Sequence, residues 1–196
     1  MKSVAMVPAA GQSRRMGEPK LLKHLHGEAL INHTIRAWQA SHVSRGVIVV
    51  RASDGQLQQH LQPLLQDDLW DIVLADPAPA EMKDSILAGI DHIQRNGAMQ
   101  DEDVLLMAPA DMPYLDPGII DALLQAHESK NPVILVPECQ GKRGHPALFP
   151  WPFALAVAQL ESDQGLNALW NQFPNRTITV VDSRSFVDMD TPADWK

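Results

Sequence analysis

Residues 46–50 read GVIVV, a run of apolar, mostly β-branched side chains with no polar residue between them. A strand with one face in water alternates apolar and polar side chains, so this run predicts a strand covered on both faces. Strands of that kind belong to parallel sheets whose two faces pack against helices. The stretch therefore predicts an α/β protein.

Short apolar runs and helical patterns alternate on both sides of this strand. Before it, residues 4–7 predict a strand and residues 29–40 carry apolar side chains at helical spacing. After it we expect strands at 71–75, 104–108, 133–136, 147–149 and 177–181, and helices at 54–65, 83–94, 116–127, 153–160 and 164–170. Repeated strand–helix–strand units predict a mostly parallel central sheet between two helical layers. Because no repeat or long linker interrupts the pattern, we expect one domain over residues 1–196.

Charge and composition limit the classes of partner. The chain has 16 Lys and Arg residues against 24 Asp and Glu residues, which gives a formal net charge of −8. Nucleic acids and anionic membranes attract basic surfaces, so we expect neither as a partner. The single cysteine, Cys139, excludes an internal disulfide framework. With no secretory signal and no apolar run of about 18 residues, we expect a cytoplasmic protein.

The loop after the first strand concentrates positive charge in this acidic chain. Residues 9–20 read AAGQSRRMGEPK. Small residues directly after a strand let the backbone approach a ligand, and successive N–H groups can form an anion-binding concavity. Arg14, Arg15 and Lys20 add charge that suits phosphate oxygens. The stretch fits neither the P-loop nor the dinucleotide-binding pattern. Its small residues and basic charge indicate either a phosphate-binding loop of another kind or a solvated basic turn.

A carboxylate follows another strand, at the same expected edge of the sheet. Asp111 stands in the sequence PADMP, directly after the strand VLLMA. Ligands of parallel sheets bind beyond the carboxyl ends of the strands, and Mg²⁺ prefers one or two carboxylates with phosphate oxygens and water. Asp111 is therefore a candidate metal ligand, and the alternative is a turn-forming or helix-capping aspartate. Asp116 suits the cap better. Taken alone, the acidic tail at 187–196 is typical of a solvated chain end.

The basic loop and the PADMP stretch together resemble elements of a known enzyme family. Residues 8–22, PAAGQSRRMGEPKLL, resemble the signature loop of the nucleotidyltransferases that modify molybdopterin, and PADMP is similar to their magnesium-binding element. The resemblance implies a nucleotide-binding loop that contains Ala9, Ala10, Gly11, Arg15 and Lys20. It also implies that Arg15 and Lys20 bind the phosphates and act in catalysis together with Asp111, the Mg²⁺ ligand.

Two further stretches resemble the parts of that family that complete the metal and nucleotide sites. VDMDTPADW (187–195) is similar to the closing D-x-D-T-P-x-D element, which implies that Asp188 or Asp190 completes the magnesium site. EMKDSILAG (81–89) stands where relatives contact base and ribose. Its Ser85 and Gly89 match the family pattern, although Ser85 taken alone is equally typical of a plain helix.

The acceptor side of the site is implied by two more stretches. KRGHP (142–146) resembles an element of the cytidylyltransferase branch, and this implies that Gly144, His145 and Pro146 contact the acceptor substrate. SDQGLNA (162–168) resembles a helix start of the same family, and it implies the same role for Asp163.

The resemblance runs from residue 7 to residue 195, and it implies the three-layer, Rossmann-like (GT-A-like) nucleotidyltransferase fold of a molybdenum cofactor cytidylyltransferase. The implied reaction transfers CMP from CTP, or the corresponding nucleotide from another NTP, to the terminal phosphate of molybdopterin. A phosphate monoester is largely ionised near neutral pH, with a second pKa of roughly 6, so no catalytic His, Ser or Cys is required. An acceptor molybdoenzyme is a further candidate partner. The alternatives are a molybdopterin guanylyltransferase, a sugar- or polyol-phosphate nucleotidyltransferase, and a non-catalytic nucleotide-binding regulator.

Overall fold

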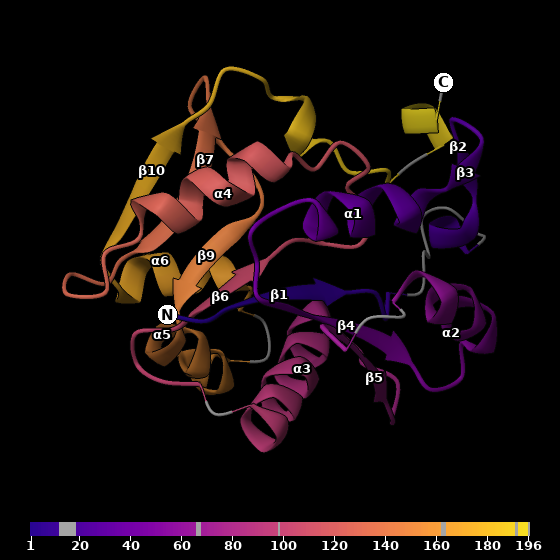
Figure 1. Cartoon of the computed structure of the whole chain (residues 1–196), viewed down its shortest axis with the longest axis horizontal. Coiled ribbons are helices and arrows are strands. Elements are labelled where there is room, and N and C mark those ends of the chain that lie inside the picture. Colours follow the sequence, from indigo (N-terminus) through magenta and orange to yellow (C-terminus); the bar gives the residue numbers. More distant parts are fainter. Residues whose placement is uncertain (12–18, 66–67, 98, 162–163, 191, 196) are drawn as a thin grey trace.

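An eight-stranded sheet forms the centre of the molecule in a computed structural model, which describes residues 1–11, 19–65, 68–97, 99–161, 164–190 and 192–195. Its strand order is β10-β7-β9-β6-β1-β4-β5, and β8 pairs with β7 (Figure 1). The strands are β1 (Ser3–Pro8), β4 (Arg45–Arg51), β5 (Trp70–Ala75), β6 (Val104–Met107), β7 (Ile134–Cys139), β8 (Lys142–Arg143), β9 (Ala147–Pro150) and β10 (Asn175–Thr179). A separate small hairpin consists of β2 (His24–Leu25) and β3 (Glu28–Ala29).

The sheet is mostly parallel, as the sequence predicts. β1 pairs in parallel with β4 and with β6, β4 with β5, and β7 with β10, whereas β9 runs antiparallel to β6 and β7. Because β1, β5 and β6 point the same way, the loops that follow them leave the sheet at one edge. This edge is where a ligand of a parallel sheet is expected.

Two helical layers cover the two faces of the sheet. α1 (Leu30–Gln39), α2 (Gly55–Leu61) and α4 (Pro117–Ala126) pack on one face, and α3 (Met82–Asn96), α5 (Trp151–Leu155) and α6 (Leu169–Gln172) pack on the other (Figure 1). The fold is therefore the expected three-layer α/β arrangement. Short 3-10 helices lie at Lys20–Leu22, Gln62–Leu64, Ala156–Gln159, Leu166–Ala168, Arg184–Phe186 and Pro192–Trp195. Two of them replace parts of the helices expected at 153–160 and 164–170.

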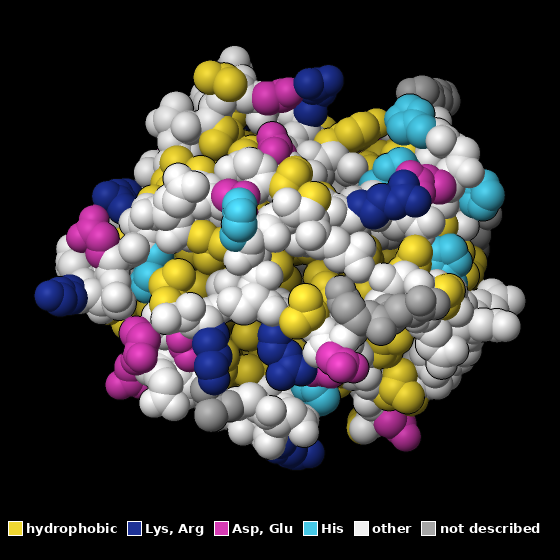
Figure 2. All heavy atoms as spheres, viewed as in Figure 1, with side chains coloured by type: hydrophobic (Ala, Val, Ile, Leu, Met, Phe, Trp, Pro, Cys, Tyr) yellow, Lys and Arg dark blue, Asp and Glu magenta, His cyan; other side chains and the backbone are white. Residues whose placement is uncertain are grey.

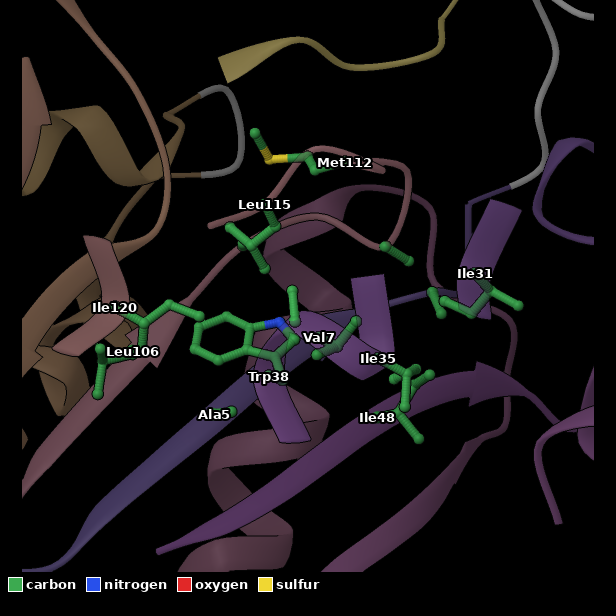
Figure 3. Packing of buried hydrophobic residues seen from close by; sticks show 14 of the residues in the cluster. Ala5, Val7, Ile31, Ile35, Trp38, Ile48, Leu106, Met112, Leu115 and Ile120 are labelled. Atoms are coloured by element: carbon green, nitrogen blue, oxygen red, sulfur yellow. The ribbon is translucent and has the colours of Figure 1, made fainter. Parts of the chain in front are cut away.

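Alternation along the central strands produces two separate cores. Ala5 and Val7 of β1 face the layer of α1, whereas Val4 and Met6 face the layer of α3. In α1 the apolar residues recur at helical spacing and form one buried face. Near the end of the helix the Trp38 ring lies among residues of β1, β6 and α4 (Figure 3). Each large apolar side chain that is fully buried contributes about 1.5–3 kcal/mol, so the two cores hold the sheet edge and its loops in place.

Side-chain caps begin two of the helices, and the one at Asp116 confirms the sequence prediction. The Asp54 side chain accepts a hydrogen bond from the Leu57 amide at 3.2 Å and caps α2. Asp116 accepts one from the Gly118 amide at 2.7 Å and caps α4, whose first residue is Pro117. The helix cap that was the alternative role for Asp111 is therefore provided by Asp116.

The surface carries charges of both signs. Figure 2 shows acidic and basic side chains interspersed over one face, with histidines gathered over the region of β2, β3 and α2. Among the described residues, no helix is both long enough and apolar enough to cross a membrane.

Candidate active site

Three charged side chains from distant parts of the sequence meet at the edge where β1 and β6 end. The Nζ atom of Lys20 hydrogen-bonds to Oδ2 of Asp111 and, at 2.6 Å, to Oδ1 of Asp190. The Lys20 and Asp111 side chains are each 13% exposed and the Asp190 side chain is 23% exposed. Such a largely buried cluster of charged side chains is typical of a functional site, because charged side chains are rarely buried elsewhere unless they are paired.

The electrostatics of this cluster are those of an ammonium group held among carboxylates. Burial lowers the pKa of Lys20, but hydrogen bonds and charge from Asp111 and Asp190 outweigh it, and the net pKa is raised. Burial, followed by the negative charges of Asp190 and Asp111, raises the pKa of the neighbouring Asp188. At Asp188 these negative charges outweigh the positive charge of Lys20, so the local potential favours a further cation.

Asp111 carries an oxygen that fits a metal ion. Its Oδ1 atom is buried and has no hydrogen-bond partner in the part of the chain that is described. A buried carboxylate oxygen is costly unless a donor or a cation satisfies it. Within the same residues no group of three His, Cys, Asp or Glu side chains could hold a metal ion by itself. The site thus offers the Asp111–Asp190 pair, and Mg²⁺ is usually held by one or two carboxylates with phosphate and water oxygens.

The C-terminal segment brings Asp190 to this position. Met189 is buried against Leu25 and Leu30, and its amide donates a hydrogen bond to the Asp111 carbonyl at 3.1 Å. Trp195 further anchors the segment, because the Lys23 Nζ atom lies 4.8 Å from the centre of its ring. Figure 1 shows this end of the chain beside β2 and β3. Of the two tail aspartates expected from the sequence, Asp190 has the direct contact with Lys20.

The start of the basic loop is described only in part. Ala9 and Ala10 are buried directly after β1, and the Ala9 amide donates to the Val49 carbonyl at 2.8 Å. A Cβ atom added to Gly11 would meet no described atom within 4 Å, so packing does not explain the glycine. Arg15, like Arg14, lies outside the described residues.

The residues expected on α3 are both buried there. Ser85 lies in its first turn, and Gly89 lies where an added Cβ would overlap Met6 and crowd Val49. Close packing of α3 on β1 and β4 is thus a structural reason for Gly89. Three further residues at the start of this stretch, Glu81, Lys83 and Asp84, also have structural roles. Asp84 accepts from the Glu81 amide at 3.0 Å in a capping box, and Lys83 donates to the Leu160 and Glu161 carbonyls at 3.0 and 2.9 Å.

The stretch expected to contact the acceptor forms a hairpin beside the same edge. The Gly144 amide donates to the Pro137 carbonyl at 2.9 Å, and the Phe186 ring packs where a side chain at position 144 would lie. Burial lowers the pKa of His145, partly opposed by its hydrogen bond with the Met107 backbone and by the charge of Asp111. The buried Nδ1 atom of His145 has no hydrogen-bond partner among the described residues. Pro146 follows through a cis peptide bond, and Asp163 lies outside the described residues.

Two residues of the site escaped the sequence reasoning. Thr34 of α1 donates from its hydroxyl to the Ala110 and Met112 carbonyls at 3.0 and 3.1 Å. The Met189 amide bonds the carbonyl of Asp111 itself. A threonine within a helix and a backbone amide in a tail give no signal in a single sequence, so neither could be found there.

A family model matches most of the chain. Residues 5–177 match the model of the MobA-like NTP transferase domain. The chain belongs to this family. The match spans β1, the Lys20 and Asp111 segments, α3 and the hairpin at 142–146, but it ends before Asp190.

Relatives of this MobA-like chain differ in their described substrates. A probable molybdenum cofactor guanylyltransferase from Pyrococcus horikoshii is 28% identical over 137 residues, which are 70% of this chain and 62% of that protein. A 2-C-methyl-D-erythritol 4-phosphate cytidylyltransferase from Azoarcus sp. is 33% identical over 124 residues, which are 62% of this chain and 50% of that protein. The chain therefore spans between half and two thirds of the length of these two relatives.

A solved structure supports the fold assignment of this MobA-like chain. The crystal structure of Rv0371c from Mycobacterium tuberculosis H37Rv has a TM-score of 0.80 at 19% identity, over 100% of this chain and 96% of that one. The same protein has been solved in complex with manganese, with a TM-score of 0.74 at 18% identity, over 100% of this chain and 96% of that one.

Proposed function

We propose that this MobA-like protein transfers CMP from CTP to the terminal phosphate of molybdopterin and releases pyrophosphate. The observation that carries the proposal is the cluster of Lys20, Asp111 and Asp190 at the sheet edge where a nucleotide is expected. It combines a cation for phosphate oxygens with a carboxylate pair for a divalent ion. The preference for CTP rests on the sequence at 9–11 and at 144–146, which resembles the cytidylyl branch.

The proposed reaction is a single displacement at phosphorus. An oxygen of the acceptor phosphate forms a bond to the α-phosphorus of CTP, the bond from that phosphorus to the bridging oxygen breaks, and pyrophosphate leaves with the electron pair. Asp111 and Asp190 hold Mg²⁺, which neutralises phosphate charge when bound. Arg15 and Lys20 bind the phosphates and stabilise the charge that develops on the leaving group.

The divalent ion is supported by two independent observations. Asp111 has a buried carboxylate oxygen without a hydrogen-bond partner in the described chain, and a protein of similar fold has been solved with manganese. Asp188 adds negative potential beside the pair, or acts as a further ligand.

The remaining proposed contacts divide between the two substrates. The nucleotide contacts Ala9, Ala10, Gly11, Ser85 and Gly89. The acceptor contacts Gly144, His145, Pro146 and Asp163. For His145 the support is its place beside Asp111, whose charge acts on it, and its Nδ1 atom, which has no hydrogen-bond partner among the residues described.

Two competing substrate assignments follow from the relatives: GTP with molybdopterin, and CTP with 2-C-methyl-D-erythritol 4-phosphate. Pyrophosphate release should be measured with CTP and with GTP, each in the presence of either acceptor and of Mg²⁺. Release that requires CTP and molybdopterin together supports the proposal. Release with GTP and molybdopterin would instead assign guanylyl transfer to this protein. Release with CTP and the erythritol phosphate would assign it the reaction of the erythritol phosphate cytidylyltransferase. Tight nucleotide binding without release under any condition contradicts an enzymatic role.

Replacing Asp111 tests the proposed chemistry directly. Asp111→Asn keeps the size of the side chain but removes the charge that holds the ion. We expect nucleotidyl transfer to fall by about 100-fold or more, the typical cost of losing one electrostatic stabiliser, while circular dichroism remains native. Asp116→Asn is the matched control, because asparagine also caps helices well. Equal activity of Asp111→Asn and the wild type would contradict the metal assignment.

A further inference from the structure

Three successive backbone carbonyl groups around Asp111 are held by hydrogen bonds from other elements. The Thr34 hydroxyl lies 3.0 Å from the Ala110 carbonyl oxygen and 3.1 Å from that of Met112. The Met189 amide lies 3.1 Å from the carbonyl oxygen of Asp111 itself. The backbone on either side of this aspartate is therefore tied to α1, and its own carbonyl to the C-terminal segment.

The Thr34 hydroxyl is fully buried. Burying a hydroxyl is unfavourable unless it is hydrogen-bonded, and a valine of nearly the same shape would avoid that cost. Threonine hydroxyls within helices commonly bond a carbonyl of their own helix. Here the hydroxyl bonds the loop instead, and its one proton is shared between two carbonyls.

The hydrogen bonds to the carbonyl groups of residues 110–112 also determine how the side chains of this loop are oriented. Ala110 and Met112 are buried members of the same hydrophobic cluster as Leu115, and Figure 3 shows the Leu115 side chain directed toward Trp38. The Asp111 side chain lies between those of Ala110 and Met112 in sequence but is directed to Lys20. The Ala110 carbonyl and the Asp111 amide belong to one planar peptide unit. Holding that carbonyl fixes the peptide plane before the Asp111 Cα atom, and the Met189 bond to the Asp111 carbonyl fixes the plane after it. Together the two planes set the direction in which the Asp111 side chain leaves the backbone.

We propose that Thr34 is a positioning residue: its hydroxyl holds the Asp111 turn so that the carboxylate is oriented for a divalent ion. This inference rests on the proposed function, because it requires that Asp111 bind the ion. Thr34 itself touches neither ion nor substrate. Partners that orient a metal ligand typically account for 10–100-fold in metal affinity or activity.

The test compares Thr34→Val, which removes the hydroxyl, with Thr34→Ser, which keeps it. Mn²⁺ alone is titrated into each full-length protein, and kcat is measured over a range of Mn²⁺ concentrations. We expect Thr34→Val to weaken Mn²⁺ binding by about 10-fold and to recover kcat when Mn²⁺ is raised. We expect Thr34→Ser to stay within about twofold of the wild type, since its hydroxyl can make the same bonds.

A control separates positioning from general loss of stability. Ile35→Val removes one buried methyl group from the same helix and no hydrogen bond, so its Mn²⁺ affinity should equal that of the wild type. Wild-type Mn²⁺ affinity in Thr34→Val, or equal weakening in Thr34→Ser or Ile35→Val, overturns the positioning role. Weakened binding in Asp111→Asn at the same time would show that the proposed function still stands. A wild-type protein that binds Mn²⁺ neither alone nor in the presence of CTP overturns both proposals.

Discussion

At the scale of single residues, Lys20 has two roles that exclude one another. Its ammonium group lies between Asp111 and Asp190, and these are the carboxylates proposed to hold the divalent ion. Lys20 bonds Oδ2 of Asp111 and Oδ1 of Asp190, so an ion on the other oxygens of these carboxylates would lie close to its ammonium group. Repulsion between such close charges in a partly buried site costs several kcal/mol. We infer that Lys20 leaves the carboxylates for the nucleotide phosphates when the ion binds, so the ion and Lys20 compete in the absence of nucleotide.

Replacing Lys20 should therefore affect ion binding and catalysis in opposite directions. In Lys20→Met we expect Mn²⁺ to bind about tenfold or more tightly without nucleotide, because the competing charge is gone. Nucleotidyl transfer should fall by about 100-fold, because one source of charge stabilisation is lost. Titration of Mn²⁺ and pyrophosphate release measure the two effects. Lys130→Met, at an exposed position away from the cluster, should change neither. Weaker Mn²⁺ binding in Lys20→Met would contradict the competition.

The same variant should also be less stable. Removing one partner of a buried ion pair leaves uncompensated charge and typically costs about 3–5 kcal/mol, less where water reaches the site. Added Mn²⁺ should restore part of the lost melting temperature, since a ligand that binds only the folded state stabilises it.

At the scale of elements, the C-terminal segment at residues 186–190 crosses the site and is called the strap below. Met189 packs into the small cluster with Leu25 and Leu30, and its amide bonds the Asp111 carbonyl. At the other end of the segment, Phe186 packs on Gly144 of the hairpin. The C-terminal segment thus holds together the β2–α1 region, the Asp111 loop and the hairpin at 142–146. The segment has little regular structure, and apolar packing keeps it in place.

Truncating Met189 should loosen this strap. Met189→Ala removes a side chain that is 1% exposed, and such changes cost about 2–5 kcal/mol. Because Asp190 is the next residue, we also expect Mn²⁺ affinity to fall several-fold even where the protein is fully folded. Val187→Ala is the matched control, since Val187 is 41% exposed and surface changes usually stay within about 0.5 kcal/mol. Unchanged Mn²⁺ affinity in Met189→Ala would show that the strap does not position Asp190.

Elements also show where prediction from sequence ends. The cap at Asp116 is predictable because its signal is local, a capping residue followed by proline. The meeting of Lys20 with Asp111 is predictable in outline, because parallel strands end at one edge. The contact of Lys20 with Asp190 depends on how Met189 packs, and the hydrogen bonds of Thr34 depend on a loop 76 residues away. The β2–β3 hairpin was missed because two-residue strands carry no periodicity.

At the scale of the whole molecule, stability should depend on histidines that the fold buries. Both ring nitrogens of His127, at the end of α4, are buried without a hydrogen-bond partner in the described chain. Burial lowers the pKa of His127, and the charge of Glu128 opposes this only in part. The pKa of His145 is lowered as well, again chiefly by burial. In the folded protein both side chains therefore take up a proton at lower pH than an imidazole in water does.

Because burial lowers the pKa of these two histidines, the free energy of unfolding depends on pH. The unfolded chain takes up these protons near the ordinary pKa of about 6.5, while the folded chain resists them. The unfolded state then binds more protons, so the free energy of unfolding decreases as pH falls below about 6.5 and is highest above it. Each such group contributes a slope of at most about 1.4 kcal/mol per pH unit.

Replacing His127 should flatten this dependence. In His127→Leu we expect the free energy of unfolding to fall less steeply than in the wild type between pH 7 and pH 5, because one buried proton-binding site is gone. Urea unfolding at several pH values in that window measures the slope, and carboxylates contribute mainly below it. His24→Gln, at an exposed position on β2, is the matched control variant. Equal slopes for His127→Leu and the wild type would show that the acid sensitivity arises elsewhere, with His145 as the next residue to replace.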